Sequence, residues 1–378
     1  MKAIINQPKD KISTTQTAVA VSSIIIGAAI LTMARPAARI MNSPDIWLSV
    51  IFGGLISIIL GIILVKLSQR FPCKTFFQFN QIIIGKLPGR VLSIITIIYY
   101  IILSGFEIRM LSELVHIYLL IRTPMEIVMI TFICVGTYLT VGGINSIVRV
   151  FELYLPVVIL LLFGIMLLGL QHFELDNLRP VLGKGFINVI KGIQATILIY
   201  VGFEIMMMLT AFMKEPKKAV KAVIVGIGIP ILLYTIISII VIGVLTVDEA
   251  KTLAWPTASL VNYIEYSGGF IENFQIFFLI VWILTIYTTF VSFHYMASLG
   301  MGQVFNKDFT VFTYVSNPII YIIALLPQNL DEVFKLGDLI GYMGIFIAGI
   351  VPVLLFIIAV IRKKGRKRKG WENDGIDT

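Results

Sequence analysis

The sequence predicts an all-α integral membrane protein, and the composition and the spacing of the apolar residues both indicate this fold class. Of the 378 residues, 58% are hydrophobic and 13% are charged, and the mean hydropathy is +0.96. A soluble domain is about 45–50% apolar and about 25% charged. Because a spanning helix needs about 20 apolar residues, the chain has room for about ten spans and for no soluble catalytic domain.

Ten apolar runs, bounded by charged residues, Pro or Gly, are the predicted spanning helices. They are Thr14–Met33, Ile46–Leu67, Val91–Leu120, Met125–Val141, Ile147–Gly169, Phe186–Phe212, Ala222–Val247, Ile271–Leu299, Phe312–Leu326 and Leu339–Ile361. The third run, at about 30 residues, must tilt or project beyond the hydrocarbon. Within one membrane domain covering residues 1–378, residues 14–169 would form the first five-helix repeat and residues 186–361 the second.

The distribution of Lys and Arg predicts the orientation, since cytoplasmic loops retain positive charge. With the N-terminus inside, 21 of the 30 Lys and Arg residues fall in cytoplasmic segments, 8 fall outside, and Arg109 lies within a span. Both termini are therefore predicted to be cytoplasmic. The basic tail, residues 362–378, would lie where anionic lipid attracts it. The formal charge of +9 thus indicates contact with the lipid bilayer and not with nucleic acid.

Two connections between spans contain apolar residues. The inner segment Ser68–Gly89 is too polar to span but rich in Phe and Ile, which predicts an interfacial amphipathic helix on the inner leaflet. The outer segment Asp248–Phe270 contains Trp255, Pro256 and the pair Gly268–Gly269. This composition is typical either of a partly ordered external cover or of an aromatic anchor at the membrane surface.

Small residues interrupt the first and the sixth predicted spans at mid-membrane depth. Gly27, Ala28 and Ala29 lie near the centre of the first span, and Gly202 lies near the centre of the sixth. Irregular backbone at this depth is tolerated only where it is buried in protein or faces water. Paired broken helices at equivalent positions mark the substrate site of inverted-repeat transporters. The alternative is close packing of small residues between helices.

Glu204, two residues beyond Gly202, favours the broken-helix interpretation. An acidic side chain near the bilayer centre costs about 2.5–3.5 kcal/mol on insertion scales, so it should face an internal cavity or a partner. Two roles fit this residue, and they are compatible. It faces a ligand cavity, or it holds the broken helix by accepting hydrogen bonds from backbone N–H groups.

The third predicted span contains a second polar cluster. Arg109 and Glu113 are four residues apart and can face each other, whereas Glu107 is two residues from Arg109 and cannot. The pair would form a structural ion pair or a gate near the outer edge of the hydrocarbon. Ser112 and His116 have the same four-residue spacing. Hydroxyl groups nearer the midplane, available to line a pocket, belong to Tyr99, Tyr100 and Ser104.

The eighth predicted span has a face of hydroxyl side chains. Their spacings of four, three and three residues keep them on one side of a helix. Turned toward the first span, they would form a polar wall for a ligand or a cation, or they would bond to backbone within the membrane. These residues are Thr285, Thr289, Ser292 and Tyr295.

The sequence contains no evident catalytic or metal-binding constellation. Cys73 falls in a predicted cytoplasmic loop and Cys134 in a predicted span, which argues against a disulfide framework or a Cys-based metal site. The histidines are too scattered for a metal motif, at His116, His172 and His294. No nucleophile–base pair is present, so we expect no enzymatic activity and no cofactor.

Several stretches resemble the amino acid–polyamine–organocation permeases. Tyr200–Gly226 resembles the sixth-helix region of that superfamily, with a G-F-E triplet before an acidic-x-Pro-basic connection, and Ile25–Ala34 resembles its broken first helix. More narrowly, nearly the whole chain is similar to the B subunit of bacterial spore germinant receptors. This similarity rests on Gly105–Pro124, Gly143, Arg149, Glu152, Pro156, Leu178–Gly185 and Gly202–Glu204.

The resemblance implies a ten-helix, inverted-repeat fold of the LeuT type with a central pocket of amino-acid size. In these permeases the substrate carboxylate meets N–H groups of the first helix and its amino group meets carbonyls at the breaks, as helix dipole ends favour. Ala29 and Ala34 replace a glycine and a proline of the family, so the first break should be tighter. The expected ligand-binding residues are Ile26, Gly27, Ala28, Ala29, Ile30, Tyr100, Ser104, Tyr200, Gly202, Phe203, Glu204, Thr285 and Thr289.

Two functions are compatible with this resemblance. In the first, a small nutrient, an amino acid in the simplest case, binds in the pocket of a germinant receptor subunit and shifts its conformation. Such a shift requires different affinities for the two states. The resemblance implies a larger A subunit and a lipoprotein C subunit as partners in the spore inner membrane. In the second, the chain is an amino acid permease. The fifth span lacks the lysine that some permeases use for proton coupling, while sodium coupling through the eighth span stays open.

Overall fold

The computed structural model describes residues 11–266 and 274–365, and its regular elements there are helices apart from one isolated bridge between Ile12 and Met213. Six segments of the described chain are long and apolar enough to span a membrane. They are α4 (Ile46–Gln69), α6 (Lys86–Tyr118), α8 (Gly143–Gly169), α11 (Ala219–Thr252), α13 (Phe274–Phe305), and α15 (Leu330–Gly344) continued by the π-helical η6 (Ile345–Ile350) into α16 (Val351–Ile361). The predicted all-α integral membrane class is confirmed.

Both spans that were predicted to be interrupted are broken. The first consists of α1 (Thr14–Ile25), α2 (Ala29–Thr32) and α3 (Ala34–Met41). The sixth runs through α9 (Phe186–Thr196) and η3 (Leu198–Tyr200), bends by 51°, and continues through η4 (Phe203–Ile205) into α10 (Met206–Phe212). Two shorter apolar helices complete the set, α7 (Met125–Val141) and α14 (Phe309–Leu325). The count of ten spans stays a prediction, because α1, α2 and α3 are each shorter than a span.

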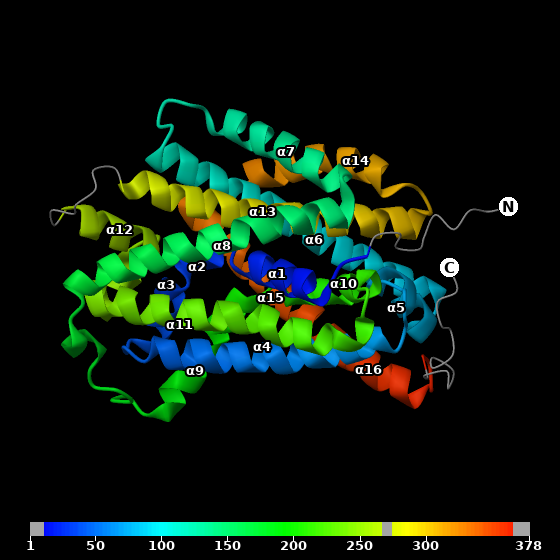
Figure 1. Cartoon of the computed structure of the whole chain (residues 1–378), viewed down its shortest axis with the longest axis horizontal. Helices are drawn as coiled ribbons and strands as arrows, with labels where there is room; N and C mark the ends of the chain where they lie inside the picture. The colour runs from blue at the N-terminus through cyan, green and yellow to red at the C-terminus, as the bar shows by residue number, and fades with distance from the viewer. Residues whose placement is uncertain (1–10, 267–273, 366–378) are drawn as a thin grey trace.

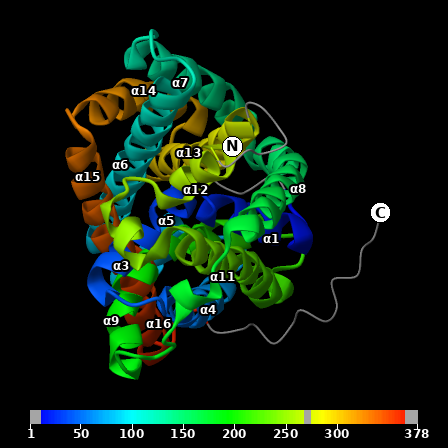
Figure 2. The ribbon, with the colours of Figure 1, turned by 90° about the vertical axis from the view of Figure 1, so that its left-hand side faces the viewer.

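The broken first span lies in the interior of the helical bundle. Figure 2, a view along the long axis, shows α6, α7, α13 and α14 grouped on one side and α4, α9 and α16 on the other, with α1 and α11 between them. In agreement, α1 packs against α11, α8 and α13. The fragment α1 begins at a capping box in which Ser13 and Gln16 exchange side-chain to backbone hydrogen bonds.

The segments predicted to lie on the inner side gather at one end of the molecule, and the orientation of that end stays a prediction. The start of α1, helix α5 (Phe76–Ile84) and the end of α16 lie toward one end of the long axis, and α12 (Pro256–Tyr266) lies at the other (Figure 1). At the first end the two broken spans are tied together, because the Ile12 N–H donates to the Phe212 carbonyl and the Lys214 N–H donates to the Ile12 carbonyl, each at 2.8 Å. Of the predicted basic tail, residues 362–378, only the first four residues belong to the part of the chain that the structure describes.

The amphipathic helix predicted within Ser68–Gly89 is present as α5. Most of its apolar side chains face the protein, where it packs against α6, α16 and α13, while Ile82 is 37% exposed. The cause is the tight turn at Gly85, whose φ of 104° folds α6 back along α5. A Cβ atom at Gly89 would lie 2.6 Å from the Gln81 Cα, which shows how closely the two helices approach. The buried side chains are Phe76, Phe77, Phe79 and Ile83.

The outer segment between α11 and α13 contains a helix, which favours the external cover over the aromatic anchor. Helix α12 begins at Pro256, and the ring of Trp255 packs 6.0 Å from that of Tyr118 and is only 4% exposed. The Thr257 hydroxyl donates to the Ile30 carbonyl at 2.8 Å, so the segment is tied to the first span. Gly268–Gly269 lies outside the described residues.

Several helices are longer than the apolar runs. Helix α6 begins at Lys86 and α8 at Gly143, and α15 begins at Leu330 after the cap Asn329, whose side chain accepts from the Glu332 N–H at 3.0 Å. The predicted runs ended where charged residues begin, although such residues fit into helix ends outside the hydrocarbon. Helix α7 begins and ends at the predicted residues, Met125–Val141.

Arg109 and Glu113 form the predicted ion pair, with Arg109 Nη2 2.7 Å from Glu113 Oε1 and both side chains almost fully buried. The Arg109 guanidinium also lies 3.5 Å from the Ala324 carbonyl of α14. Ser112 and His116, whose spacing allows them to face each other, are each bonded to another group. The Ser112 hydroxyl donates to the Ile108 carbonyl at 2.8 Å, the usual bond of a hydroxyl within a helix, and His116 lies 3.2 Å from the Thr123 carbonyl.

Single cysteines should report opposite sides of the membrane at Lys86 and Lys184, both exposed. The background replaces the two exposed cysteines, Cys73 and Cys134, by Ser. In intact cells, an impermeant thiol reagent should label Lys184→Cys directly and Lys86→Cys only after permeabilisation. Labelling of both variants in intact cells would overturn the predicted orientation.

Glu113→Ala should destabilise the protein strongly, because it leaves the Arg109 charge buried without its partner. Removal of one member of a buried pair typically costs about 3–5 kcal/mol, whereas an apolar replacement of the pair is often neutral. We expect a large drop in the thermal unfolding temperature in detergent for Glu113→Ala. The double variant Arg109→Met, Glu113→Leu should recover most of the lost unfolding temperature. If the double variant is as unstable as the single one, the loss in Glu113→Ala does not come from an unpaired buried charge.

Candidate ligand-binding site

A cavity of about 620 Å³ lies beside the break in the first span. Its volume is in the range of small-molecule sites, roughly 300–1,000 Å³. The walls come from α1–α3, α6, α9, η3, α13 and α15, and they include the apolar side chains of Leu103, Phe106 and Phe293 together with Val201 at the second break. Charged residues from α3 and α15, on the predicted outer side, also line it. They are Arg35, Arg39, Asp331, Lys335 and Asp338.

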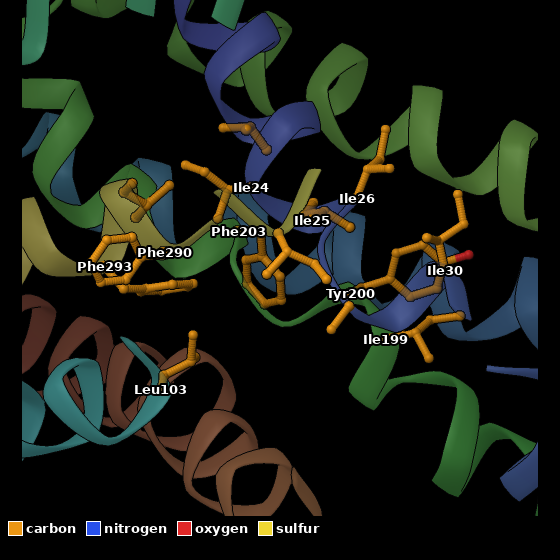
Figure 3. Packing of buried hydrophobic residues seen from close by; sticks show 14 of the residues in the cluster. Ile24, Ile25, Ile26, Ile30, Leu103, Ile199, Tyr200, Phe203, Phe290 and Phe293 are labelled. Atoms are coloured by element: carbon orange, nitrogen blue, oxygen red, sulfur yellow. The ribbon is translucent and has the colours of Figure 1, made fainter. Parts of the chain in front are cut away.

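Residues from both breaks gather in one core. Figure 3 shows Ile24 and Ile25, at the end of α1, close to Phe203, which follows the second break, with Phe293 of α13 nearby. The two breaks therefore share a buried environment in which every polar backbone group needs a partner from the protein. Within the described ranges, no three His, Cys, Asp or Glu side chains are placed to hold a metal ion.

Hydroxyl groups satisfy the backbone carbonyls at the end of α1. Because the helix stops at Ile25, the carbonyls of its last turn lack donor partners further along the helix. Of the hydroxyl face predicted on the eighth span, Thr289 turns toward the first span and supplies one donor. Thr288, which was not in the predicted set, supplies a second, and Tyr234 of α11 supplies the third. Both threonine hydroxyls also lie within hydrogen-bond distance of the Thr285 carbonyl of their own helix. The bonds run from Thr288 to the Ser23 carbonyl at 3.0 Å, from Thr289 to that of Ile24 at 3.0 Å, and from Tyr234 to that of Ile25 at 2.7 Å.

A carboxylate from α6 meets the N–H side of the same break. The Glu107 side chain, which is 5% exposed, lies beside the Ala28 N–H and lines the cavity together with Ala28. Its second oxygen, Oε2, has no hydrogen-bond partner among the described residues. Spacing along the sequence related Glu107 only to Arg109, so its role at the break was missed. The signal that could have revealed this role is the presence of an acidic residue within an apolar span, the same signal that drew attention to Glu204.

Glu204 performs the equivalent role at the second break. Its Oε2 accepts the Gly202 N–H at 2.7 Å, its Oε1 accepts the Tyr99 hydroxyl at 2.9 Å, and the residue is fully buried. Gly202 has a φ of 127°, which is open to glycine and strained for other residues. Of the two predicted roles, the structure shows the one that holds the broken backbone, and Glu204 does not line the cavity.

Four of the residues expected to bind ligand line the cavity, namely Gly27, Ala28, Ala29 and Thr289. The fit at Gly27 is tight, because a Cβ atom there would lie 2.5 Å from Thr289 Oγ1. The space beside the break thus depends on the absence of a side chain at this position.

The other expected residues are buried around the cavity and form its support. Ile26, Ile30 and Phe203 belong to the apolar core, and the Tyr100 ring packs 5.4 Å from that of Phe293. The remaining hydroxyls bond to backbone. Their bonds run from Ser104 to Tyr100 at 2.7 Å, from Tyr200 to Val50 at 2.9 Å and from Thr285 to Trp282 at 3.1 Å.

Two solved structures of transporters share this fold. The chain is similar to Mhp1, a nucleobase–cation symporter solved with bromovinylhydantoin bound, at a TM-score of 0.73 and 14% identity over 97% of this chain and 83% of that one. It is also similar to MhsT in complex with L-phenylalanine, at a TM-score of 0.67 and 13% identity over 93% of this chain and 99% of that one. The expected LeuT-type fold is thereby confirmed.

Sequence comparison identifies the family. Residues 11–333 match the family model described as spore germination protein, or spore permease. The chain is 39% identical to spore germination protein YndE of Bacillus subtilis (strain 168), over 95% of this chain and 99% of that protein. It is 33% identical to spore germination protein B2 of the same organism, over 95% and 98%. The expected resemblance is confirmed, and the chain belongs to the spore germination protein family of permease-like membrane proteins.

Proposed function

We propose that this chain is the nutrient-recognition subunit of a spore germination receptor and that an amino acid binds in the cavity beside the first break. The observation that carries the proposal is the position of that cavity, where the interrupted backbone of the first span meets α6, α13 and α15 in a member of a spore germination family. The binding of L-phenylalanine and bromovinylhydantoin by proteins of the same fold supports a small-molecule ligand.

The signal would be a shift between two conformations. A ligand can shift such an equilibrium only by its different affinity for the two states. The cavity suits this role because its walls belong to several different helices, which can move relative to one another. Helices α3 and α15 contribute charged residues to the lining, and Thr257 of α12 is bonded to the Ile30 carbonyl. A ligand that bridges these walls would favour the state in which they are close.

An amino acid permease is the alternative function. The similar transporter structures support a small-molecule site in either case and do not separate a receptor from a permease. The two proposals differ in one measurable property, which is net uptake. Proteoliposomes containing this chain should bind the nutrient without accumulating it if the chain is a receptor. Accumulation driven by a proton or sodium gradient would establish the permease.

The proposed partners are the A and C subunits of a germinant receptor, in the spore inner membrane with both termini cytoplasmic. Family membership supports this assembly. Affinity purification of the tagged chain from solubilised spore inner membranes should recover a larger membrane subunit and a lipoprotein in constant ratio. Recovery of the chain alone under conditions that keep it folded would contradict the assembly.

Gly27→Ala should impair the nutrient response, because the new methyl group would displace Thr289 and weaken its bond to the Ile24 carbonyl. We expect spores that depend on this protein to need at least about tenfold more nutrient, the effect of about 1.4 kcal/mol on binding. The matched control is Gly164→Ala in α8, where a Cβ atom meets nothing within 4 Å. Equal dose responses for the two variants, at equal protein levels, would show that the break is not part of the binding site.

Glu204→Gln should raise the nutrient concentration required for germination. The amide removes the charge and places an NH₂ donor where the carboxylate accepts the Gly202 N–H and the Tyr99 hydroxyl. An unmatched buried polar group costs about 1–3 kcal/mol, or roughly fivefold to a hundredfold in an equilibrium. Tyr99→Phe, which deletes one donor and retains the charge, should have a smaller effect. An unchanged dose response together with higher thermal stability for Glu204→Gln would show that the carboxylate does not support the break.

A further inference from the structure

We infer that the cavity recognises its ligand through a protonated amine, which binds Oε2 of Glu107. This inference rests on the proposed function and makes it specific. It reverses the orientation implied by the resemblance to amino acid permeases, in which the ligand carboxylate meets the N–H groups of the first break and the amine meets the carbonyls. The ligand class is therefore amines and amino acids, and not carboxylic acids that lack an amine.

The first observation is that a carboxylate of the protein already occupies the N–H side of the break. The Glu107 side chain lies beside the Ala28 N–H, and both residues line the cavity at this point. A ligand carboxylate that approached the same N–H groups would meet a like charge in a buried site, where repulsion is only weakly screened. The helix terminus that holds the substrate carboxylate in the permeases thus holds a side chain here.

The second observation is that protein donors already occupy the carbonyl side of the break. The three carbonyls at the end of α1 each lie within hydrogen-bond distance of a hydroxyl, from Thr288, Thr289 and Tyr234. The two threonine hydroxyls share their proton with the Thr285 carbonyl of their own helix. A ligand amine at these carbonyls would have to share acceptors that are already bonded. Oε2 of Glu107, by contrast, is buried in the cavity wall and lacks a hydrogen-bond partner among the described residues. A buried carboxylate oxygen favours a charged donor, and an ammonium group is the complementary ligand.

The third observation is an unpartnered cationic donor in the same cavity. Arg35 of α3 lines the cavity and places its guanidinium over the Phe334 ring, 4.5 Å from its centroid. Its Nε is buried and has no hydrogen-bond partner in the described ranges. Arg39, by comparison, donates through Nε to the Lys251 carbonyl at 2.9 Å. Arg35 is therefore the group that would receive the carboxylate of an amino acid whose amine binds Glu107.

The test compares matched ligands on the purified full-length chain. The probes are L-valine, L-leucine and L-phenylalanine, their decarboxylated amines isobutylamine, 3-methylbutylamine and phenethylamine, and their deaminated acids 3-methylbutanoate, 4-methylpentanoate and 3-phenylpropanoate. Thermal stabilisation in detergent, titrated with each probe, gives its dissociation constant. We expect at least one amino acid and its amine to stabilise the protein, and the matching acid to have no effect.

Three variants assign the groups. Glu107→Gln should weaken both the amino acid and the amine by about tenfold or more, since it removes the charge that the ammonium meets. Arg35→Gln should weaken the amino acid and leave the amine unchanged. The control is Glu126→Gln on α7, an exposed carboxylate outside the cavity, which should change neither. Unfolding temperatures without probe show whether each variant is folded.

The outcomes separate this inference from the proposed function. Stabilisation by the acids and not by the amines, or undiminished amine binding in folded Glu107→Gln, overturns the orientation and leaves a nutrient cavity in place. Stabilisation by none of the probes overturns both.

Discussion

The whole arrangement depends on one constraint, which is that backbone groups exposed by a broken helix at membrane depth must find partners inside the protein. The chain meets this constraint twice with a buried carboxylate. Glu107 lies beside the Ala28 N–H at the first break, and Glu204 accepts the Gly202 N–H at the second. Hydroxyl groups of α11 and α13 satisfy the carbonyls. The breaks, the buried acids and the polar face of α13 thus form one polar network that involves several helices.

The sequence predicted the parts of this polar network that depend on local composition, namely the breaks and the polar face. Gly27 and Gly202 located both breaks, because small residues in the middle of an apolar run mark either a break or a close contact between helices, and the three- and four-residue spacings on the eighth span predicted its polar face. Contacts between distant elements were not predictable in this way. The role of Glu107 depends on a partner in another helix, and the burial of α5 depends on the backbone turn at Gly85. Both were missed because spacing rules describe neighbours on one helix.

The same physical features serve a receptor and a transporter, since each needs a site whose occupancy changes the relative stability of two conformations. In this chain, side chains of the protein lie at both polar sides of the first break. The cavity therefore presents an acid at the break and a cation, Arg35, among the charged residues of α3 and α15. These are the two groups that the inferred ligand, a zwitterion bound in one direction, would meet.

The most direct test of nutrient binding at the break is the protection of a cysteine in the cavity wall. Val201→Cys, in protein lacking Cys73 and Cys134, places a thiol of similar size at the second break, where Val201 lines the cavity. We expect nutrients that trigger germination of spores dependent on this protein to slow its modification by a small thiol reagent, and nutrients that do not trigger germination to leave the rate unchanged. Lys184→Cys, outside the cavity, should react at the same rate throughout. Equal rates of Val201→Cys modification with and without a saturating triggering nutrient would contradict binding at the break.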